Sequence, residues 1–101
     1  MTDPFTHPAV LGDDVLVQPV SEEAVLLDLA SGVYFGLNPS GARFWTLLGE
    51  LGTGEAAVRA MIAEFEVSAE TLRTDMRRLL QDLLERGLVT LGPGGADSNG
   101  A

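Results

Sequence analysis

The sequence predicts an α+β fold in which a three-stranded antiparallel sheet is followed by three helices. Three observations lead to this prediction. Short apolar runs separated by turn residues fill the first third of the chain, an asparagine–proline pair starts a helix directly after one of these runs, and later segments carry apolar residues at helical spacing. Because so small a sheet cannot bury its own apolar face, we expect the helices to cover one side of it.

Composition limits the class of protein. The 101 residues are 46% hydrophobic, which suffices for one domain with one core. No cysteine is present, so disulfides, thiolate metal sites and a cysteine nucleophile are excluded. No apolar run reaches the ~20 residues that cross a bilayer and no signal peptide is found, so we expect a cytoplasmic protein. The formal net charge of −9 disfavours nucleic acid and anionic lipid as partners.

The two ends of the chain are predicted to lie outside the domain. Residues 1–12 contain two prolines, a histidine and apolar residues without a period, which predicts a mobile tail. Residues 92–101 are rich in glycine, with Pro, Ser and Asn, which predicts disorder. The folded domain is therefore expected to span residues 13–91.

The three strands are expected to form a meander. Residues 15–18 form a short strand closed by Pro19, which suits an edge position. Residues 25–29 form the second strand, and the glycine-ended segment 30–32 provides a hairpin turn. The third strand, residues 33–37, is then an edge with no lysine, proline or inward charge to block pairing. Such an edge either self-associates or binds a guest strand, and we expect a guest.

Three helices are predicted after the strands. The first begins at Asn38, an N-cap followed by proline, and ends in the glycines of residues 49–54. The second places apolar residues on one stripe between residues 58 and 65. The third is capped by Ser68 and stops at Gly87. Residues 88–91 are expected to form a short wing strand.

The third helix has more apolar surface than its own core requires. Its leucines and one methionine span an arc of about 140°, whereas a stripe of ~100° is enough to contact a core. Arg73 and Arg77 border one side of this arc, and Asp75, Asp82 and Arg86 border the other. Each arginine alone also fits a solvated helix charge. Together, beside an open strand edge, they predict a groove for an extended peptide with acidic residues.

No arrangement of residues indicates catalysis. His7, the only histidine, lies in the predicted tail without a partner at ligand spacing. The pairs Asp13-Asp14 and Glu22-Glu23 fall in turns and do not form a general acid–base pair. The glycines of residues 92–95 do not form a phosphate-binding loop, because they follow no strand and open no helix. We therefore expect a protein without catalytic activity, metal or cofactor.

The order of strands, three helices and a wing is winged-helix-like, and that fold is best known for DNA binding. Between residues 69 and 87, however, four arginines are balanced by four acids. A recognition helix without net positive charge, on a strongly negative molecule, does not favour DNA. A winged-helix regulatory or dimerisation module stays as an alternative.

Two stretches resemble a known family. The segment AVLLDLASGVYFGLNPSGARFW, residues 24–45, and the segment LLQDLLERGLV, residues 79–89, are similar to the PqqD family of small precursor-peptide recognition domains. The likeness covers residues 15–91. The hairpin ending in Tyr-Phe-Gly-Leu-Asn is its more specific part, whereas the closing segment is common in winged helices.

This resemblance implies a non-catalytic chaperone that holds the leader of a ribosomal precursor peptide as an added strand and presents it to a processing enzyme. A free-standing chain further resembles the recognition proteins of lasso-peptide pathways, whose partners are a leader peptidase and a cyclase. A PqqD-type partner of a radical S-adenosylmethionine enzyme is the alternative. Carried onto this sequence, the implied peptide-binding residues are Val33, Tyr34, Phe35, Gly36 and Leu37 on the strand and Leu72, Arg73, Asp75, Met76, Arg77, Leu80 and Leu84 on the helix.

Strand chemistry supports the same mechanism. Backbone pairing along an edge gives affinity, and side-chain pockets give register and selectivity. Alternation places Val33, Phe35 and Leu37 on one face and Tyr34 and Gly36 on the other. We therefore assign Phe35 and Leu37 to the core, while Tyr34 fits an ordinary surface tyrosine equally well. A homodimer paired through this edge is the competing use of the strand.

Overall fold

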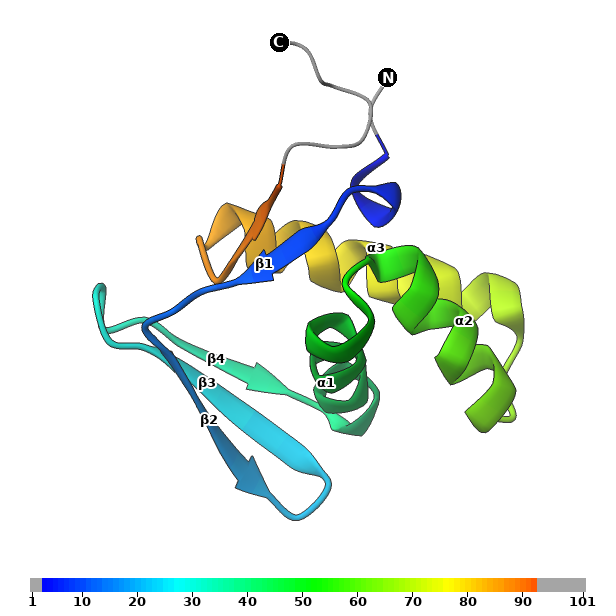
Figure 1. Cartoon of the computed structure of the whole chain (residues 1–101). Coiled ribbons are helices and arrows are strands. Elements are labelled where there is room, and N and C mark those ends of the chain that lie inside the picture. Colours follow the sequence, from blue (N-terminus) through cyan, green and yellow to red (C-terminus); the bar gives the residue numbers. More distant parts are fainter. Residues whose placement is uncertain (1–2, 93–101) are drawn as a thin grey trace, which may run out of the picture.

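The computed structural model describes residues 3–92 and contains two small sheets and three helices in that range (Figure 1). The predicted α+β fold, with a three-stranded antiparallel sheet and three helices, is confirmed. The elements are a 3-10 turn η1 (Pro4–Thr6), strands β1 (Ala9–Leu11), β2 (Val15–Val20), β3 (Glu23–Asp28), β4 (Tyr34–Leu37) and β5 (Val89–Leu91), and helices α1 (Pro39–Leu51), α2 (Gly54–Glu64) and α3 (Ala69–Glu85).

The larger sheet is the predicted meander, with strand order β2-β3-β4 and both neighbours antiparallel. Leu26 in the central strand lies opposite Val17 on one side and Phe35 on the other, which fixes the register. β2 is longer than predicted, because Pro19 stays within it opposite Ala24 instead of ending it. β2 and β4 are therefore the two edges of this sheet.

The N-terminal residues are packed onto the domain, so the predicted mobile tail is wrong for residues 3–12. Phe5 is fully buried, and its ring lies 6.1 Å from that of Phe44 in α1, centroid to centroid. β1 pairs antiparallel with β5, so the predicted wing strand exists but has the N-terminal strand as its partner. Gly92 also donates its N–H to the carbonyl of Pro8 over 2.7 Å. The structure describes the chain up to residue 92, so the disorder predicted for the C-terminal end falls on residues outside the described range.

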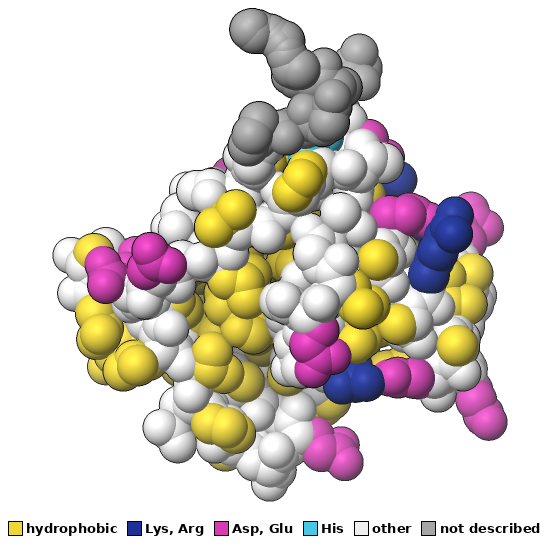
Figure 2. Space-filling model, viewed as in Figure 1, with side chains coloured by type: hydrophobic (Ala, Val, Ile, Leu, Met, Phe, Trp, Pro, Cys, Tyr) yellow, Lys and Arg dark blue, Asp and Glu magenta, His cyan; other side chains and the backbone are white. Residues whose placement is uncertain are grey.

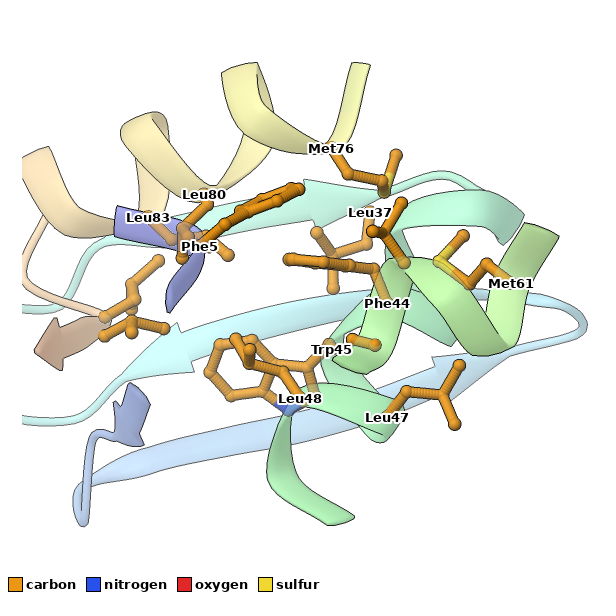
Figure 3. Packing of buried hydrophobic residues seen from close by; sticks show 14 of the residues in the cluster. Phe5, Leu37, Phe44, Trp45, Leu47, Leu48, Met61, Met76, Leu80 and Leu83 are labelled. Carbon is orange, nitrogen blue, oxygen red and sulfur yellow. The ribbon is translucent and has the colours of Figure 1, made fainter. Parts of the chain in front are cut away.

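One core lies between the inner face of the larger sheet and the helices (Figure 3). In this view Phe5 lies close to Leu80 and Leu83 of α3, and Phe44 of α1 lies below Leu37 of β4. The N-terminal segment thus fills a gap that the helices leave open. Among the described residues, no helix combines the length and the apolar character that crossing a bilayer requires.

The helix ends follow the predicted caps. The Asn38 side chain accepts a hydrogen bond from the N–H of Gly41, and the Ser68 hydroxyl accepts one from the N–H of Thr71. Gly87, with φ of +73°, ends α3, and the N–H of the buried Leu88 donates to the carbonyl of Leu83. The chain therefore turns at Gly87 directly into β5, and this turn fixes the position of α3 across the molecule.

Candidate functional site

The outer edge of β4 is open. The strand pairs with β3 on one side and with no described segment on the other. The N–H of Asp28 donates to the carbonyl of Val33 over 2.9 Å, and inward and outward positions alternate along an antiparallel strand. The backbone N–H and C=O groups of Tyr34 and Gly36 therefore point away from β3. These are the groups through which an added strand can pair.

Side chains of β4 alternate as predicted. Leu37 is buried, and Phe35 is partly buried and packed against the core. Tyr34 is 70% exposed, and Gly36 is exposed as well. The backbone of this strand is thus anchored by its inner side chains, while its free edge remains accessible.

A groove with a volume of about 390 Å³ separates β4 from α3. Its lining comes from three elements, and the residues of α3 lie more than thirty positions after those of β4 and α1. β4 and the following cap contribute Phe35, Gly36, Leu37 and Asn38, the first turn of α1 contributes Ser40 and Gly41, and α3 contributes Asp75, Met76, Arg78, Leu79 and Asp82.

Gly41 permits the close approach of α1 to this groove. A Cβ atom at this position would lie 3.3 Å from the Cδ2 atoms of both Leu37 and Leu79. A larger residue would push one of these leucines aside. The small residues Ser40 and Gly41 of the first turn therefore lie where β4 and α3 come together.

Arg86 joins the far end of α3 to β4. Its guanidinium carbon lies 5.1 Å from the centroid of the Phe35 ring, which is within the range of a cation–π contact. This contact links the end of the helix to the central residue of the edge strand, and it supports the spacing between the two walls of the groove.

The structure brings only some of the predicted helix residues to the groove. Asp75 and Met76 line it, and Met76 is also part of the core. Leu72 and Leu80 are buried in the core, and Leu84 is partly buried against it, but none of these three lines the groove. The apolar arc of α3 is thus used mostly for packing.

Arg73 and Arg77 face α2 and the N-terminal segment, so the prediction that they border the groove is corrected. Arg73 forms two hydrogen bonds with the carboxylate of Glu55, at 2.8 and 3.0 Å. Arg77 forms two with Asp3, at 2.7 and 3.1 Å, and its guanidinium lies 4.6 Å from the centroid of the Phe5 ring. Both arginines connect elements of the fold.

These ion pairs change the acidity of their carboxylates. Hydrogen bonds from Arg73 first, and then from Arg59, lower the pKa of Glu55 from 4.5 to about 2. The hydrogen bond from Arg77 lowers the pKa of Asp3 as well. Both carboxylates are therefore charged at neutral pH and hold their arginines away from the groove.

The predicted binding set lacks six residues of the groove, namely Asn38, Ser40 and Gly41 at the start of α1 and Arg78, Leu79 and Asp82 of α3. The helical arc had two borders, and the acidic border with Asp75 and Asp82 is the one that faces β4. Leu79 is the apolar residue between them, and no ion pair of the described residues involves Arg78. The groove therefore combines apolar side chains with charged side chains of both signs.

The described residues offer no alternative centre with metal-binding chemistry. Within residues 3–92, no group of three His, Cys, Asp or Glu side chains is placed to hold a metal ion. The imidazole Nδ1 of His7 lies 3.2 Å from the carbonyl oxygen of Asp3, within its own segment. The site that the described chain presents is thus a binding groove beside a strand edge.

A free strand edge beside a side-chain groove is the arrangement found in domains that bind extended peptides by strand addition. The chain belongs to the PqqD family, because the family model described as "Coenzyme PQQ synthesis protein D (PqqD)" matches residues 23–89. The match includes β3, β4, all three helices and the first residue of β5. Both walls of the groove therefore lie within the part that defines the family.

Two solved structures are similar to this chain over nearly their whole length. "TbiB1 in Complex with the TbiA(beta) Leader Peptide" is 34% identical with a TM-score of 0.71, and the match covers 88% of this chain and 98% of that chain. "Lasso peptide synthetase B1 complexed with the leader peptide" is 25% identical with a TM-score of 0.71, and the match covers 82% and 98%. Among curated proteins, no match is found.

Proposed function

We propose that this protein binds the leader segment of a ribosomally made precursor peptide and presents it to a processing enzyme in lasso-peptide biosynthesis. The observation that carries this proposal is the open edge of β4 beside the groove formed with α3. Both similar structures are complexes with a leader peptide, which supports the same class of ligand here.

The leader would bind as a fourth strand of the larger sheet. Its backbone would pair with the outward N–H and C=O groups of Tyr34 and Gly36. Side chains of an added strand alternate, so every second residue would point into the groove toward Met76 and Leu79. Apolar leader residues suit these two side chains, and an acidic residue suits Arg78.

The proposed binding residues differ in part from those implied by the resemblance. Val33 precedes β4, and its backbone carbonyl accepts from Asp28, so it supports the edge without facing the guest. Leu72, Leu80 and Leu84, with Arg73 and Arg77, support α3 from the other sides. The proposed set is Tyr34, Phe35, Gly36 and Leu37 of β4 with Asp75, Met76, Arg78, Leu79 and Asp82 of α3.

In this proposal the protein has no catalytic role of its own. It works in the cytoplasm with a leader peptidase and a cyclase, and its recognition domain includes residues 3–12, because these residues complete the core and pair with β5. A free β4 edge could also pair with a second copy, which makes the oligomeric state part of the test.

The test first searches the reading frames next to the gene for a short precursor peptide and then titrates the full chain with the fluorescently labelled leader of that peptide. Saturable binding in the nanomolar to micromolar range, absent for a scrambled leader, supports the proposal. Gel filtration with and without leader separates leader binding from homodimerisation. Failure of the leader to bind at any concentration, or salt-dependent binding of duplex DNA in its place, contradicts the proposal.

A further inference from the structure

A second hollow, of about 520 Å³, lies between β2 and α1, and we call it the β2 hollow. α1 contributes Ala42, Trp45 and Thr46, whose i, i+3 and i+4 spacing places them on one face of the helix. The groove beside α3 uses Ser40 and Gly41 of the same helix, and it shares no lining residue with the β2 hollow. The two are therefore separate surfaces of the domain.

The β2 hollow exposes apolar side chains on the helix side of the sheet. Val17 lies opposite the buried Leu26, so its side chain points toward the helices, yet it is 44% exposed. Pro19, opposite the buried Ala24, is exposed as well. Phe65, the C-cap of α2, adds an aromatic side chain to the lining. Figure 2 shows hydrophobic side chains gathered between the sheet and α1, where an apolar group of a ligand can be buried.

The β2 hollow also carries excess negative charge. Glu22 and Glu23 line it at the β2–β3 turn, and neither takes part in an ion pair among the described residues. Arg43 lines it too, but its guanidinium is held by two hydrogen bonds to Glu64, at 2.9 and 2.7 Å. In Figure 2 the dark blue basic side chains lie over the helices, and none is visible over the sheet. A ligand in this hollow thus meets apolar side chains beside two carboxylates.

A smaller hollow, of about 270 Å³, connects the groove to the β2 hollow at the end of the sheet. It shares Gly36, Leu37 and Asn38 with the groove. It shares Glu23 and Ala24 with the β2 hollow. Two strand spacings, ~10 Å, separate β4 from β2, and ~3 extended residues span that distance. A peptide that leaves the edge of β4 at Leu37 can therefore reach the β2 hollow within a few residues.

We infer that the leader makes a second contact with this protein, in which the residues preceding its strand-forming segment bind the β2 hollow. The inference rests on the proposed function. A guest strand antiparallel to β4, like the other neighbours in this sheet, has its N-terminal end beside Leu37, where the connecting hollow begins. The leader thus enters the groove by way of the β2 hollow.

Charge and polarity define the leader segment that fits. An apolar side chain suits the space beside Pro19 and Phe65, and an adjacent lysine or arginine can pair with Glu22 or Glu23. The contact uses side chains of β2 and not its backbone. The N–H of Val17 therefore stays unpaired, and any apolar side chain at position 17 is sufficient.

A weak contact in the β2 hollow is enough to matter. Once the strand segment is bound, a linker of a few residues holds the preceding segment at an effective concentration in the millimolar range. A contact with a dissociation constant near ~0.1 mM then strengthens the whole leader about tenfold. The edge of β4 supplies affinity for many sequences, and the β2 hollow adds selectivity for a basic, apolar segment.

A second copy of this chain is the competing occupant of the β2 hollow. Its formal net charge of −9 disfavours its approach to Glu22 and Glu23. The leader segment has the additional advantage of being tethered beside the hollow by the strand-bound part.

The test compares two forms of the leader on the isotope-labelled full chain. One is the complete leader of the precursor peptide found beside the gene, and the other lacks the residues before the strand-forming segment. The complete form should bind about tenfold more tightly. It should also shift the indole N–H signal of Trp45, the one tryptophan of the chain, which lines the β2 hollow. Both forms should protect the N–H groups of Tyr34 and Gly36 from exchange.

A variant that fills the β2 hollow gives an independent readout. Thr46 is exposed on α1, and Thr46→Phe places a ring in the hollow. The complete leader should lose its about tenfold advantage, whereas the affinity of the shortened leader should not change. Thr74→Phe is the matched control, because Thr74 is exposed on α3 and lines neither the groove nor the two hollows.

A charge variant tests the basic residue of the leader. Glu22→Gln combined with Glu23→Gln should weaken the complete leader about threefold to tenfold and leave the shortened leader unchanged. Asp13→Asn combined with Asp14→Asn removes the same charge from the turn before β2, outside all three surfaces, and should have no effect. Both are measured at about 0.15 M salt, where charges more than ~8 Å apart are largely screened.

Five outcomes overturn the inference. They are equal binding of both leader forms, a leader with fewer than about four residues before its strand-forming segment, an equal effect of Thr46→Phe and Thr74→Phe, an equal effect of the two charge variants, and a Trp45 signal that follows protein concentration instead of leader. Each of these leaves the protection of Tyr34 and Gly36 by the leader intact. Failure of both leader forms to bind contradicts the proposed function instead.

Discussion

The two edges of the larger sheet differ in what they offer another chain. Leu26 directs its backbone groups toward β4, so the residue opposite it in β2, Val17, points its own groups outward, and Pro19 does the same two positions later. Proline has no N–H, so the outer edge of β2 lacks a donor where a new strand would need one. Tyr34 and Gly36 of β4 keep both donor and acceptor.

The surroundings of the two edges differ as well. β4 lies beside α3 across a groove lined by apolar and charged side chains, which can read the side chains of an added strand. β2 also borders a hollow, of about 520 Å³, which it shares with α1, so the two edges differ in the helix beside them and in the donor that is missing at Pro19. The β2 edge of the sheet thus lacks a backbone donor for a new strand, whereas the β4 edge keeps its donors and acceptors.

Proline substitution at the two edges is expected to give the largest difference. Tyr34→Pro removes an outward donor from β4 and places a ring where the guest backbone would lie, so leader affinity should fall at least about a hundredfold. Val17→Pro makes the matched change on β2 and should leave leader affinity unchanged. Fluorescence polarisation with labelled leader measures both. Equal effects of the two variants would remove the distinction between the edges.

The groove wall is expected to give the next largest effect. Leu79→Ser replaces an apolar groove residue by a polar one and should weaken leader binding about tenfold. Leu84→Ser changes another partly buried leucine of α3 that packs against the core and does not line the groove. Both substitutions should lower the melting temperature, but only Leu79→Ser should weaken leader binding. Isothermal titration and thermal unfolding separate the two readouts.

Adjacent arginines of α3 are expected to separate binding from stability. Arg78→Ala removes a positive charge from the groove and should weaken the binding of an acidic leader about three- to tenfold. Arg77→Ala removes the ion pair with Asp3 and the contact with the Phe5 ring. Since both charged groups are partly exposed, the free energy of unfolding should fall by only about 1 kcal/mol. If Arg77→Ala alone lost leader binding, the side of α3 that carries Arg77, and not the side that carries Arg78, would face the leader.

Acid is expected to lower the free energy of unfolding only slightly, and to do so by protonating Glu55, which pairs with Arg73 on the side of α3 away from the groove. The pKa of Glu55 is lowered from 4.5 to about 2, so its stabilising contribution is present above pH 4.5 and is lost as the pH falls toward 2. Glu55→Gln should lower the free energy of unfolding at neutral pH by less than about 1 kcal/mol and flatten its decrease in acid. Urea unfolding at several pH values measures this. An unchanged pH profile would contradict the structural role of the Glu55–Arg73 pair.

Local sequence signals were sufficient for the elements near the site. The Asn38-Pro39 start of α1, the Ser68 cap and the glycine stop of α3 all act within a few residues, so they could be read directly. Strand alternation in β4 likewise gave the correct inner and outer residues. The open edge followed from these elements, because the hairpin leaves β4 with one neighbour.

Long-range contacts were not visible in the sequence. Val10 pairs with Thr90, eighty positions away, and no local pattern marks β1 as its partner. The burial of Phe5 likewise depends on contacts with residues far away in the sequence, such as Phe44. A helical arc has two borders, and only the docking of α3 decides which one faces β4. Arg73 and Arg77 are held by Glu55 and Asp3, so the border with Asp75 and Asp82 became the wall of the groove.

The most direct measurement is amide hydrogen exchange of the full chain with and without leader, followed residue by residue by NMR. If the leader adds a strand to β4, the N–H groups of Tyr34 and Gly36 exchange fast in the free protein and become protected in the complex, while that of Val17 keeps its rate. Protection at the edge of β2, or saturating leader without any change at Tyr34 and Gly36, would contradict strand addition at β4.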